Sequence, residues 1–205
     1  GQVQESLAKM AKKHGMWLVA GTVFIKATDR VRAATLVFDE QGDCVARYDK
    51  MHLFDVRISG CESYQESATI EPGNEIMIVH TPVGCLGLTV CYDLRFPELY
   101  RQLVMRGAEI FTVPSAFTQT TGLAHWQILL RARAIENLCY VLAPNQGGVH
   151  QNGRETYGHS MIIGPWGNIL GQVEKGEGLV VVDIDLPHLH ELRKQFPCNE
   201  HHVIN

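Results

Sequence analysis

The residues with the clearest capacity for chemistry are a cysteine and a lysine, each at the end of an apolar segment. Cys91 follows the short apolar segment 85–90, and the turn 91–96 leads to Pro97, which suits the first position of a helix. A cysteine at the exit of a buried strand exposes its sulfur while the following backbone N–H groups point into the same space. That arrangement suits a thiol nucleophile with an oxyanion hole. A buried, inert cysteine is nevertheless the commoner situation, so Cys91 alone decides nothing.

Lys50 is the best partner for Cys91 because it lies where a strand-like segment, 44–48, meets a loop. A cation near a thiol stabilises both the thiolate and the oxyanion that forms after its attack. Glu66, on the polar segment 49–74, is placed to hold and orient this lysine. Taken singly, Lys50 has the character of a surface charge and Glu66 that of an exposed loop acid. Their significance depends on pairing with Cys91.

Histidine is the usual base for a cysteine nucleophile, and the interior histidines are His52, His125 and His159. His125 stands at a predicted helix start, where capping or packing is the more ordinary role. His159 follows Tyr157 and Gly158 at the entry to a strand and is placed to line a pocket. A cysteine–histidine protease is therefore an alternative, although no known local signature of that class surrounds Cys91.

The composition predicts one ordinary globular domain over residues 1–205. The sequence is 45% hydrophobic and 20% charged, and its formal net charge of −4 gives no support for a nucleic-acid partner. No apolar run approaches the roughly 20 residues that cross a membrane. The six cysteines form no CxxC pair and no metal-ligand spacing, so we expect reduced thiols in a cytoplasmic protein, with no metal and no cofactor.

Hydrophobic periodicity predicts helices and strands that alternate in a layered α/β fold with a mixed sheet. Segments 49–74 and 145–158 lack periodicity, so we expect them to be loops that form pocket walls together with Phe117 and Thr118. The predicted helices are 3–14, 97–106, 125–137 and a terminal one after Asp185, and the predicted strands are 16–24, 34–38, 44–48, 76–80, 85–90, 110–113, 140–143, 160–163, 169–173 and 179–184.

The helix 125–137 carries two arginines with different expected roles. Arg133 is predicted to lie on its solvated face. Arg131 is predicted to pair internally with an acid such as Glu136, and not to bind substrate.

Several segments resemble motifs of the nitrilase superfamily of carbon–nitrogen hydrolases. Residues 48–55, YDKMHLFD, resemble its lysine motif, and residues 91–99, CYDLRFPEL, resemble its cysteine motif. Further blocks match in the same order and with similar spacing at 114–117, 122–126, 131–137 and 157–160. The resemblance spans nearly the whole chain and is greatest to the amidase branch that includes deaminated-glutathione amidases and omega-amidases.

The resemblance implies a four-layer αββα sandwich and a thiol-dependent amidase acting on a small amide that bears a carboxylate. Cys91 would attack the amide carbonyl and form a thioester, which water then hydrolyses. Lys50 and the Tyr92 N–H would stabilise the oxyanion, and Glu66 would support Lys50. We expect Tyr92, Phe117, Thr118 and His159 to bind substrate. The helices after Cys91 and from His125 match those that pair subunits in the family, which implies a homodimer.

One family feature has no counterpart in these residues. The glutamate that acts as general base comes from a strand-and-loop segment upstream of the helix that opens this sequence, and Glu5, inside that helix, does not replace it. We therefore expect these 205 residues to be part of a longer protein. The alternatives are a catalytically silent relative that serves as a binding or assembly subunit, an omega-amidase with a different substrate, and an acyl transferase.

Overall fold

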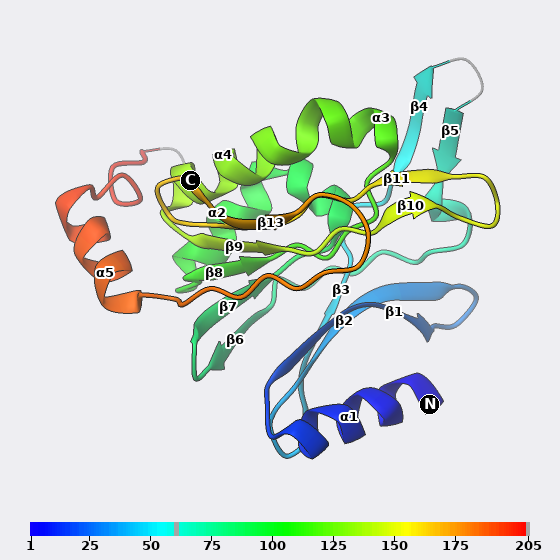
Figure 1. Ribbon diagram of the computed structural model, residues 1–205, viewed down its shortest axis with the longest axis horizontal. Helices are drawn as coiled ribbons and strands as arrows, with labels where there is room; N and C mark the ends of the chain where they lie inside the picture. The colour runs from blue at the N-terminus through cyan, green and yellow to red at the C-terminus, as the bar shows by residue number, and fades with distance from the viewer. Residues whose placement is uncertain (60–61, 204–205) are drawn as a thin grey trace.

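Two β-sheets lie face to face with helices on both outer sides, so the layers follow the order α, β, β, α (Figure 1). The computed structural model describes residues 1–59 and 62–203. Three separate clusters of buried apolar side chains fill the three spaces between neighbouring layers. The four-layer sandwich expected from the sequence is therefore present.

The smaller sheet is antiparallel and consists of β1 (Leu18–Lys26), β2 (Val31–Phe38) and β3 (Cys44–Asp49). Helix α1 (Gln2–His14) covers its outer face, and the buried residues between them are Ala11, Ala20, Leu36 and Phe38. Gly15 ends α1 with φ 59°, a left-handed conformation that glycine adopts without strain. This sheet brings Lys50, the residue after β3, toward the second sheet.

The larger sheet has six strands in the order β13-β12-β9-β8-β7-β6, and β7–β8 and β8–β9 are its parallel pairs. Helices α2 (Pro97–Met105) and α4 (Gln127–Asn137) cover its outer face over buried residues such as Trp126 and Leu130. Between the two sheets lie Val37, Leu88 and Ile110. The strands are β6 (Ile78–Thr81), β7 (Gly84–Leu88), β8 (Ile110–Thr112), β9 (Tyr140–Ala143), β12 (Ser160–Ile163) and β13 (Ile169–Val173).

Two segments predicted as loops contain short antiparallel hairpins. Residues 49–74 contain β4 (Asp55–Ser59), β5 (Glu62–Gln65) and the 3-10 helix Glu66–Ala68, while residues 145–158 contain β10 (Gly147–Val149) and β11 (Glu155–Tyr157). Strands of three to five residues are too short for alternation to identify them in the sequence. Both hairpins extend from the same side of the sandwich (Figure 1).

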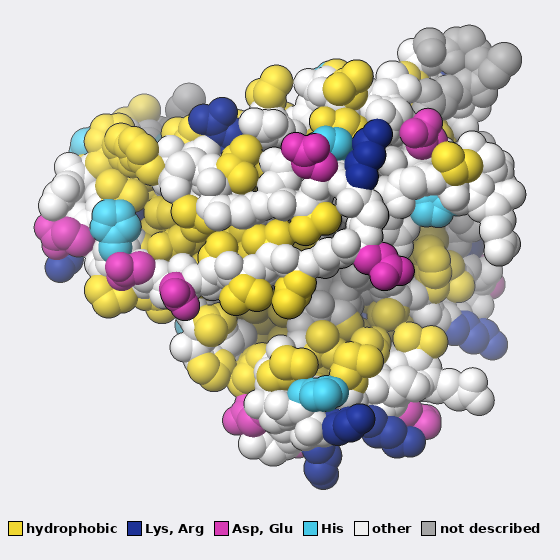
Figure 2. All heavy atoms as spheres, viewed as in Figure 1, with side chains coloured by type: hydrophobic (Ala, Val, Ile, Leu, Met, Phe, Trp, Pro, Cys, Tyr) yellow, Lys and Arg dark blue, Asp and Glu magenta, His cyan; other side chains and the backbone are white. Residues whose placement is uncertain are grey.

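The strand predicted for residues 179–184 is wrong, because this segment has no strand hydrogen bonding in the structure. Its side chains do alternate: Leu179 and Val181 are 84% and 79% exposed, while Val180 and Val182 are partly buried. Val180 packs over Gly171 of β13, so the segment runs beside that strand without forming a backbone ladder with it. Hydrophobic side chains gather on this face of the molecule (Figure 2).

The remaining α- and π-helices are the short α3 (Gln119–Thr121), the single π-helical turn Gly122–Trp126 that leads into α4, and the ten-residue α5 (Leu186–Gln195). Within the described ranges, no helix combines the length and the apolar character that crossing a membrane requires.

Candidate active site

Cys91 stands at a strained turn between strand β7 and helix α2. It begins the 3-10 helix Cys91–Arg95 with φ 51°, a left-handed conformation that is costly for a residue with a side chain. The Cys91 N–H donates to the Pro114 carbonyl at 3.0 Å, and the Val90 N–H donates to Asp93 Oδ2 at 2.8 Å. These bonds hold the turn so that the half-buried Cys91 side chain faces a cavity of about 660 Å³.

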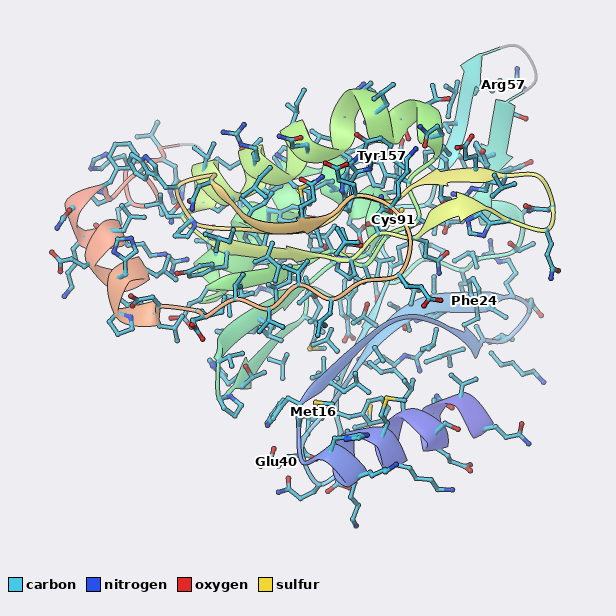
Figure 3. All side chains as sticks on the ribbon, viewed as in Figure 1. Met16, Phe24, Glu40, Arg57, Cys91 and Tyr157 are labelled. Atoms are coloured by element: carbon cyan, nitrogen blue, oxygen red, sulfur yellow. The ribbon has the colours of Figure 1, made fainter. Side chains whose placement is uncertain are left out.

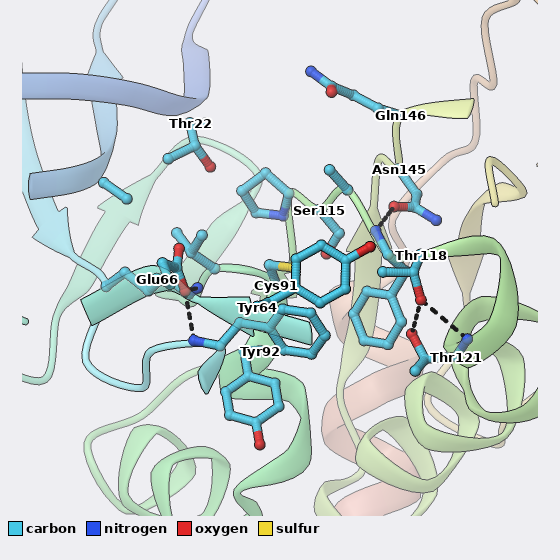
Figure 4. Close-up of a pocket in the computed structure, with 18 of the residues that line it drawn as sticks. Thr22, Tyr64, Glu66, Cys91, Tyr92, Ser115, Thr118, Thr121, Asn145 and Gln146 are labelled. Carbon is cyan, nitrogen blue, oxygen red and sulfur yellow. Dashed lines mark hydrogen bonds and ion pairs between the residues drawn. The ribbon is translucent and has the colours of Figure 1, made fainter. Parts of the chain in front are cut away.

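The cavity lies where both sheets and both hairpins meet. Cys91 from the larger sheet and Phe24 from the smaller one both line it (Figure 3). Figure 4 shows Cys91 among Tyr64, Tyr92 and Ser115, with Glu66 on one side and Asn145 on the other. The lining residues used below are Lys50, Phe54, Tyr64, Glu66, Cys91, Tyr92, Arg95, Ala116, Phe117, Thr118, Asn145 and Arg154.

Lys50 and Glu66 form an ion pair in the wall of this cavity. The Lys50 side chain is only 3% exposed, and its Nζ donates to Glu66 Oε2. The same oxygen accepts the Phe54 N–H at 2.6 Å, and Glu66 opens the 3-10 helix Glu66–Ala68. Glu66 therefore fixes the lysine head in a desolvated place, as the sequence suggests.

The surroundings of Cys91 act in opposite directions on its acidity. Burial raises the pKa of the Cys91 thiol, while the Lys50 ammonium and a backbone hydrogen bond from Ala116 lower it. Glu66 raises the pKa of Cys91 by its negative charge, and Arg154 lowers it by its positive charge. Burial is the largest of these effects, so the net shift of the Cys91 pKa is upward.

Tyr92, Phe117 and Thr118 all line the cavity. The Tyr92 N–H lies in the first turn of a 3-10 helix, where backbone donors are not used by the helix itself. The Phe117 N–H donates to Asn145 Oδ1 at 3.0 Å, and Thr118 Oγ1 lies 2.9 Å from Thr121 Oγ1. Both side chains belong to the fixed wall of the cavity.

The structure places His159 outside the residues that line this cavity. Its ring stacks on Tyr157 with the centroids 4.0 Å apart, and its Nδ1 lies 2.9 Å from the Tyr157 carbonyl oxygen. His159 instead borders a second cavity, of about 310 Å³, beside β12 and β13. His159 does stand directly before strand β12, as the sequence predicts. The backbone has positive φ at Gly158 (71°) and at His159 (57°), and this turn directs the ring to Tyr157 and away from the cavity of Cys91.

Asp93 is a buried residue of the Cys91 turn that sequence reasoning missed. It is fully buried, and its two oxygens accept hydrogen bonds from the Tyr48 hydroxyl at 2.8 Å and from the His52 N–H at 3.0 Å. Tyr48 and His52 stand two residues on either side of Lys50, and Asp93 stands two residues after Cys91. A signal did exist, since an acid in the first turn after a buried strand needs buried donors.

The two arginines of α4 have the reverse of their predicted roles. Arg133 is buried, donates to the Leu94 carbonyl from Nε and Nη2 at 3.0 and 2.8 Å, and pairs with Glu136 at 2.8 Å. Arg131 is exposed and donates to the Gly167 carbonyl. Arg133 therefore joins α4 to the 3-10 helix that begins at Cys91. The face of α4 that carries Arg133 is buried, whereas its sequence pattern predicted a solvated face.

Five cysteines are free thiols: Cys44, Cys85, Cys91, Cys139 and Cys198, while Cys61 lies outside the described residues. Over residues 1–59 and 62–203, no cluster of three or more His, Cys, Asp or Glu side chains is suited to a metal ion.

Comparison with known proteins settles the family. The family model for carbon–nitrogen hydrolases matches residues 1–194. The chain belongs to the carbon–nitrogen hydrolase family. This membership confirms the expected superfamily, and it confirms the expected class of enzyme, one that hydrolyses amide C–N bonds.

Three relatives show how far the likeness of this carbon–nitrogen hydrolase extends. It is 45% identical to a deaminated glutathione amidase of Yersinia enterocolitica, covering 98% of this chain and 72% of that protein. Its structure is similar to that of the NitFhit protein of C. elegans, with a TM-score of 0.88, 42% identity and coverage of 97% of this chain. It spans 49% of the NitFhit chain. It is also similar to an E41Q mutant of the amidase from Nesterenkonia sp. AN1, with a TM-score of 0.77, 28% identity and coverage of 96% of this chain and 74% of that one. These likenesses confirm the αββα fold class.

Proposed function

We propose that this protein is a thiol-dependent amidase that acts on a small amide bearing a carboxylate, with deaminated glutathione as the first candidate substrate. The observation that carries the proposal is the juxtaposition of Cys91, at a strained turn, with the buried Lys50 ammonium in one cavity. The similarity to a deaminated glutathione amidase supports the choice of substrate. The Nesterenkonia amidase, in which acrylamide is joined to the active-site cysteine, supports a cysteine in this role.

In the proposed reaction, Cys91 loses its proton to a base and its sulfur attacks the amide carbonyl, forming a carbon–sulfur bond. The oxyanion is stabilised by the Lys50 ammonium and the Tyr92 N–H. The C–N bond then breaks, the leaving amine or ammonia takes up the proton, and water hydrolyses the thioester. Glu66 holds Lys50 in position, while Phe117 and Thr118 form the wall beside the bound amide.

The proposed reaction also needs a base that takes the proton of Cys91. Among the described residues that line the cavity, Glu66 is the one carboxylate, and its Oε2 already accepts bonds from Lys50 and Phe54. Glu66 is therefore committed to Lys50 and to the Phe54 backbone.

Because Lys50 and the Phe54 N–H already bind Glu66 Oε2, a second candidate function is also favoured, that of a catalytically silent binding or assembly subunit. The mass of the intact natural protein distinguishes the two candidates. Additional N-terminal residues favour the enzyme, whereas a natural product of 205 residues favours the silent relative.

The experiment that tests the main proposal is a screen of the purified whole protein against deaminated glutathione and omega-amides of small acids. Cleavage is followed as release of cysteinylglycine or of ammonia. The Cys91→Ala variant is expected to abolish turnover while leaving the melting temperature near that of the unchanged protein. Unchanged turnover in Cys91→Ala would refute the proposal.

A homodimer and a cytoplasmic location are part of the same proposal. Leu123 and Ile128, on the outer layer around α4, are 72% and 69% exposed, as expected of apolar residues that pack against a second copy. The free thiols named above support a reducing compartment.

A further inference from the structure

The described lining of the cavity contains more positively charged than negatively charged side chains. This lining contains three cationic side chains, Lys50, Arg95 and Arg154, and a single carboxylate, Glu66, which is already paired with Lys50. Among residues 1–58 and 63–203, whose side chains the structure describes, no carboxylate lies at ion-pair distance from Arg95 or Arg154.

Arg95 lines the cavity but is held by two aromatic rings and an exposed histidine. Its guanidinium lies over the Phe117 and Tyr92 rings, 5.6 and 5.8 Å from their centroids. Its Nη2 lies 3.3 Å from His125 Nδ1, in an exposed contact on the α4 side. Solvent weakens a charge in that position.

Arg154 is held differently, at the start of β11 in the hairpin β10–β11. Its Nη2 donates to the Ala116 carbonyl at 2.6 Å, and its guanidinium lies 5.3 Å from the centroid of the Tyr64 ring. Its Nε is buried and has no hydrogen-bond partner in the described structure. A guanidinium donates five hydrogen bonds in a planar fork that fits a carboxylate, so an unused buried donor here marks a place for one.

The Ala116 carbonyl accepts from Arg154 Nη2, and Ala116, Arg154 and Cys91 all line the same cavity. A ligand whose carboxylate is bound by Arg154 therefore shares that cavity with Cys91. The field of Arg154 is also felt at the sulfur, because it lowers the pKa of that thiol.

We propose that Arg154 binds a carboxylate of the substrate and thereby makes the cavity selective for amides of dicarboxylic acids and related acid amides. This inference rests on the proposed amidase function. It assigns the selection to Arg154 and not to Arg95, because Arg154 is held on the cavity wall by the Ala116 carbonyl and has an unused buried donor.

The test uses the whole protein with two probes that share the same scissile amide: glutaramate, and glutaramate methyl ester, in which the carboxylate is masked. The unchanged protein is expected to have the lower KM for glutaramate. Arg154→Gln is expected to raise that KM by about 10- to 100-fold, since hydrogen bonds to charged groups contribute about 1.5–3 kcal/mol. The KM for the ester is expected to change by less than about threefold, because the ester offers no charge to the arginine. The KM of Arg154→Lys for glutaramate is expected to lie between those of the unchanged protein and of Arg154→Gln, because lysine keeps the charge but lacks the planar guanidinium.

Arg131→Gln is the matched control, because Arg131 also donates to a backbone carbonyl but lies outside the cavity lining. It is expected to leave both KM values unchanged. Equal losses on acid and ester in Arg154→Gln, or no loss on either, would overturn the inference and assign Arg154 a structural role. Equal KM values for acid and ester in the unchanged protein would overturn it too, while leaving the amidase function intact. Failure of the unchanged protein to cleave any amide in the wider screen would refute the proposed function itself, and the inference with it.

Discussion

Asp93 and His52 are joined twice: Asp93 Oδ1 accepts the His52 N–H at 3.0 Å and lies 2.7 Å from the His52 ring Nδ1. The His52 ring also stacks on Phe96, with the centroids 3.7 Å apart. The loop after Lys50 is thus fastened to the turn that carries Cys91 by one buried carboxylate. Asp93 therefore holds the turn of Cys91 and the segment on both sides of Lys50 together.

Asp93→Asn is expected to lower the free energy of unfolding by about 2–4 kcal/mol, because an amide cannot accept all the buried donors that a carboxylate serves. Turnover is expected to fall by more than tenfold, because Lys50 and Cys91 are no longer held together. Urea unfolding and the rate of amide hydrolysis measure the two effects. Asp43→Asn, at an exposed position after β2, is expected to change stability by less than about 0.5 kcal/mol. Equal stability of the two variants would contradict the role given to Asp93.

The Cys91 thiol is expected to react slowly with iodoacetamide at pH 7 and faster as the pH rises. Burial raises its pKa, so the half-maximal rate should lie above the ordinary thiol value of about 8.5. Lys50→Met removes a cation that lowers this pKa, so the midpoint should move to still higher pH. Mass mapping of the Cys91 peptide gives the rate at this thiol alone.

The control for that titration is Lys9→Met, which removes an exposed charge from α1. It should leave the Cys91 midpoint in place. Cys139 gives an internal reference, because burial raises its pKa to about 12 and it should stay unlabelled throughout the neutral range. A midpoint that falls in Lys50→Met would contradict the role of the lysine charge.

Glu66→Gln is expected to reduce kcat by about 10- to 100-fold with a smaller effect on KM, because Lys50 loses the carboxylate that orients it toward the oxyanion. Stability should fall by about 1–3 kcal/mol, since Lys50 is almost fully buried while Glu66 is 24% exposed. Steady-state kinetics and urea unfolding provide the measurements.

Glu71→Gln is the matched variant for Glu66. Glu71 also pairs with a basic residue, Arg32 at 2.5 Å, but outside the cavity lining. Glu71→Gln should lower the free energy of unfolding by at most about 1 kcal/mol and leave turnover unchanged. If the two variants have the same kcat, the role of Glu66 in orienting Lys50 is wrong.

Ile128→Lys is expected to convert a homodimer into a monomer, because it places a charge at an apolar position of α4 that is exposed in the single chain. Light scattering across a concentration series gives the oligomeric state. Val83→Lys, in the turn between β6 and β7, changes a similarly exposed valine on another part of the molecule and should leave the dimer intact. A whole protein that is monomeric at all concentrations would contradict the dimer.

The sequence by itself determined the features that depend on neighbouring residues. The apolar segment before Cys91, Pro97 at the first helical position and the polar turn 39–43 between two strand-like segments are local patterns, and each led to the correct element. Motif order then predicted that Lys50, Glu66 and Cys91 belong to one site, and the structure brings all three to one cavity.

Only the tertiary structure decided what depends on contacts between distant segments. Asp93 meets residues 41 and 45 positions earlier, and Arg154 meets a carbonyl 38 positions earlier, so neither partner can be inferred from local periodicity. Residues 179–184 have the alternation of a strand, but a strand also needs a backbone partner, and none pairs with them in the described structure. His159 has a pocket-like place in the sequence, yet the backbone turn at Gly158 and His159 directs its ring to Tyr157. Local patterns select the elements because they act through adjacent side chains, whereas burial, ion pairing and the direction of a side chain are fixed only when distant segments pack.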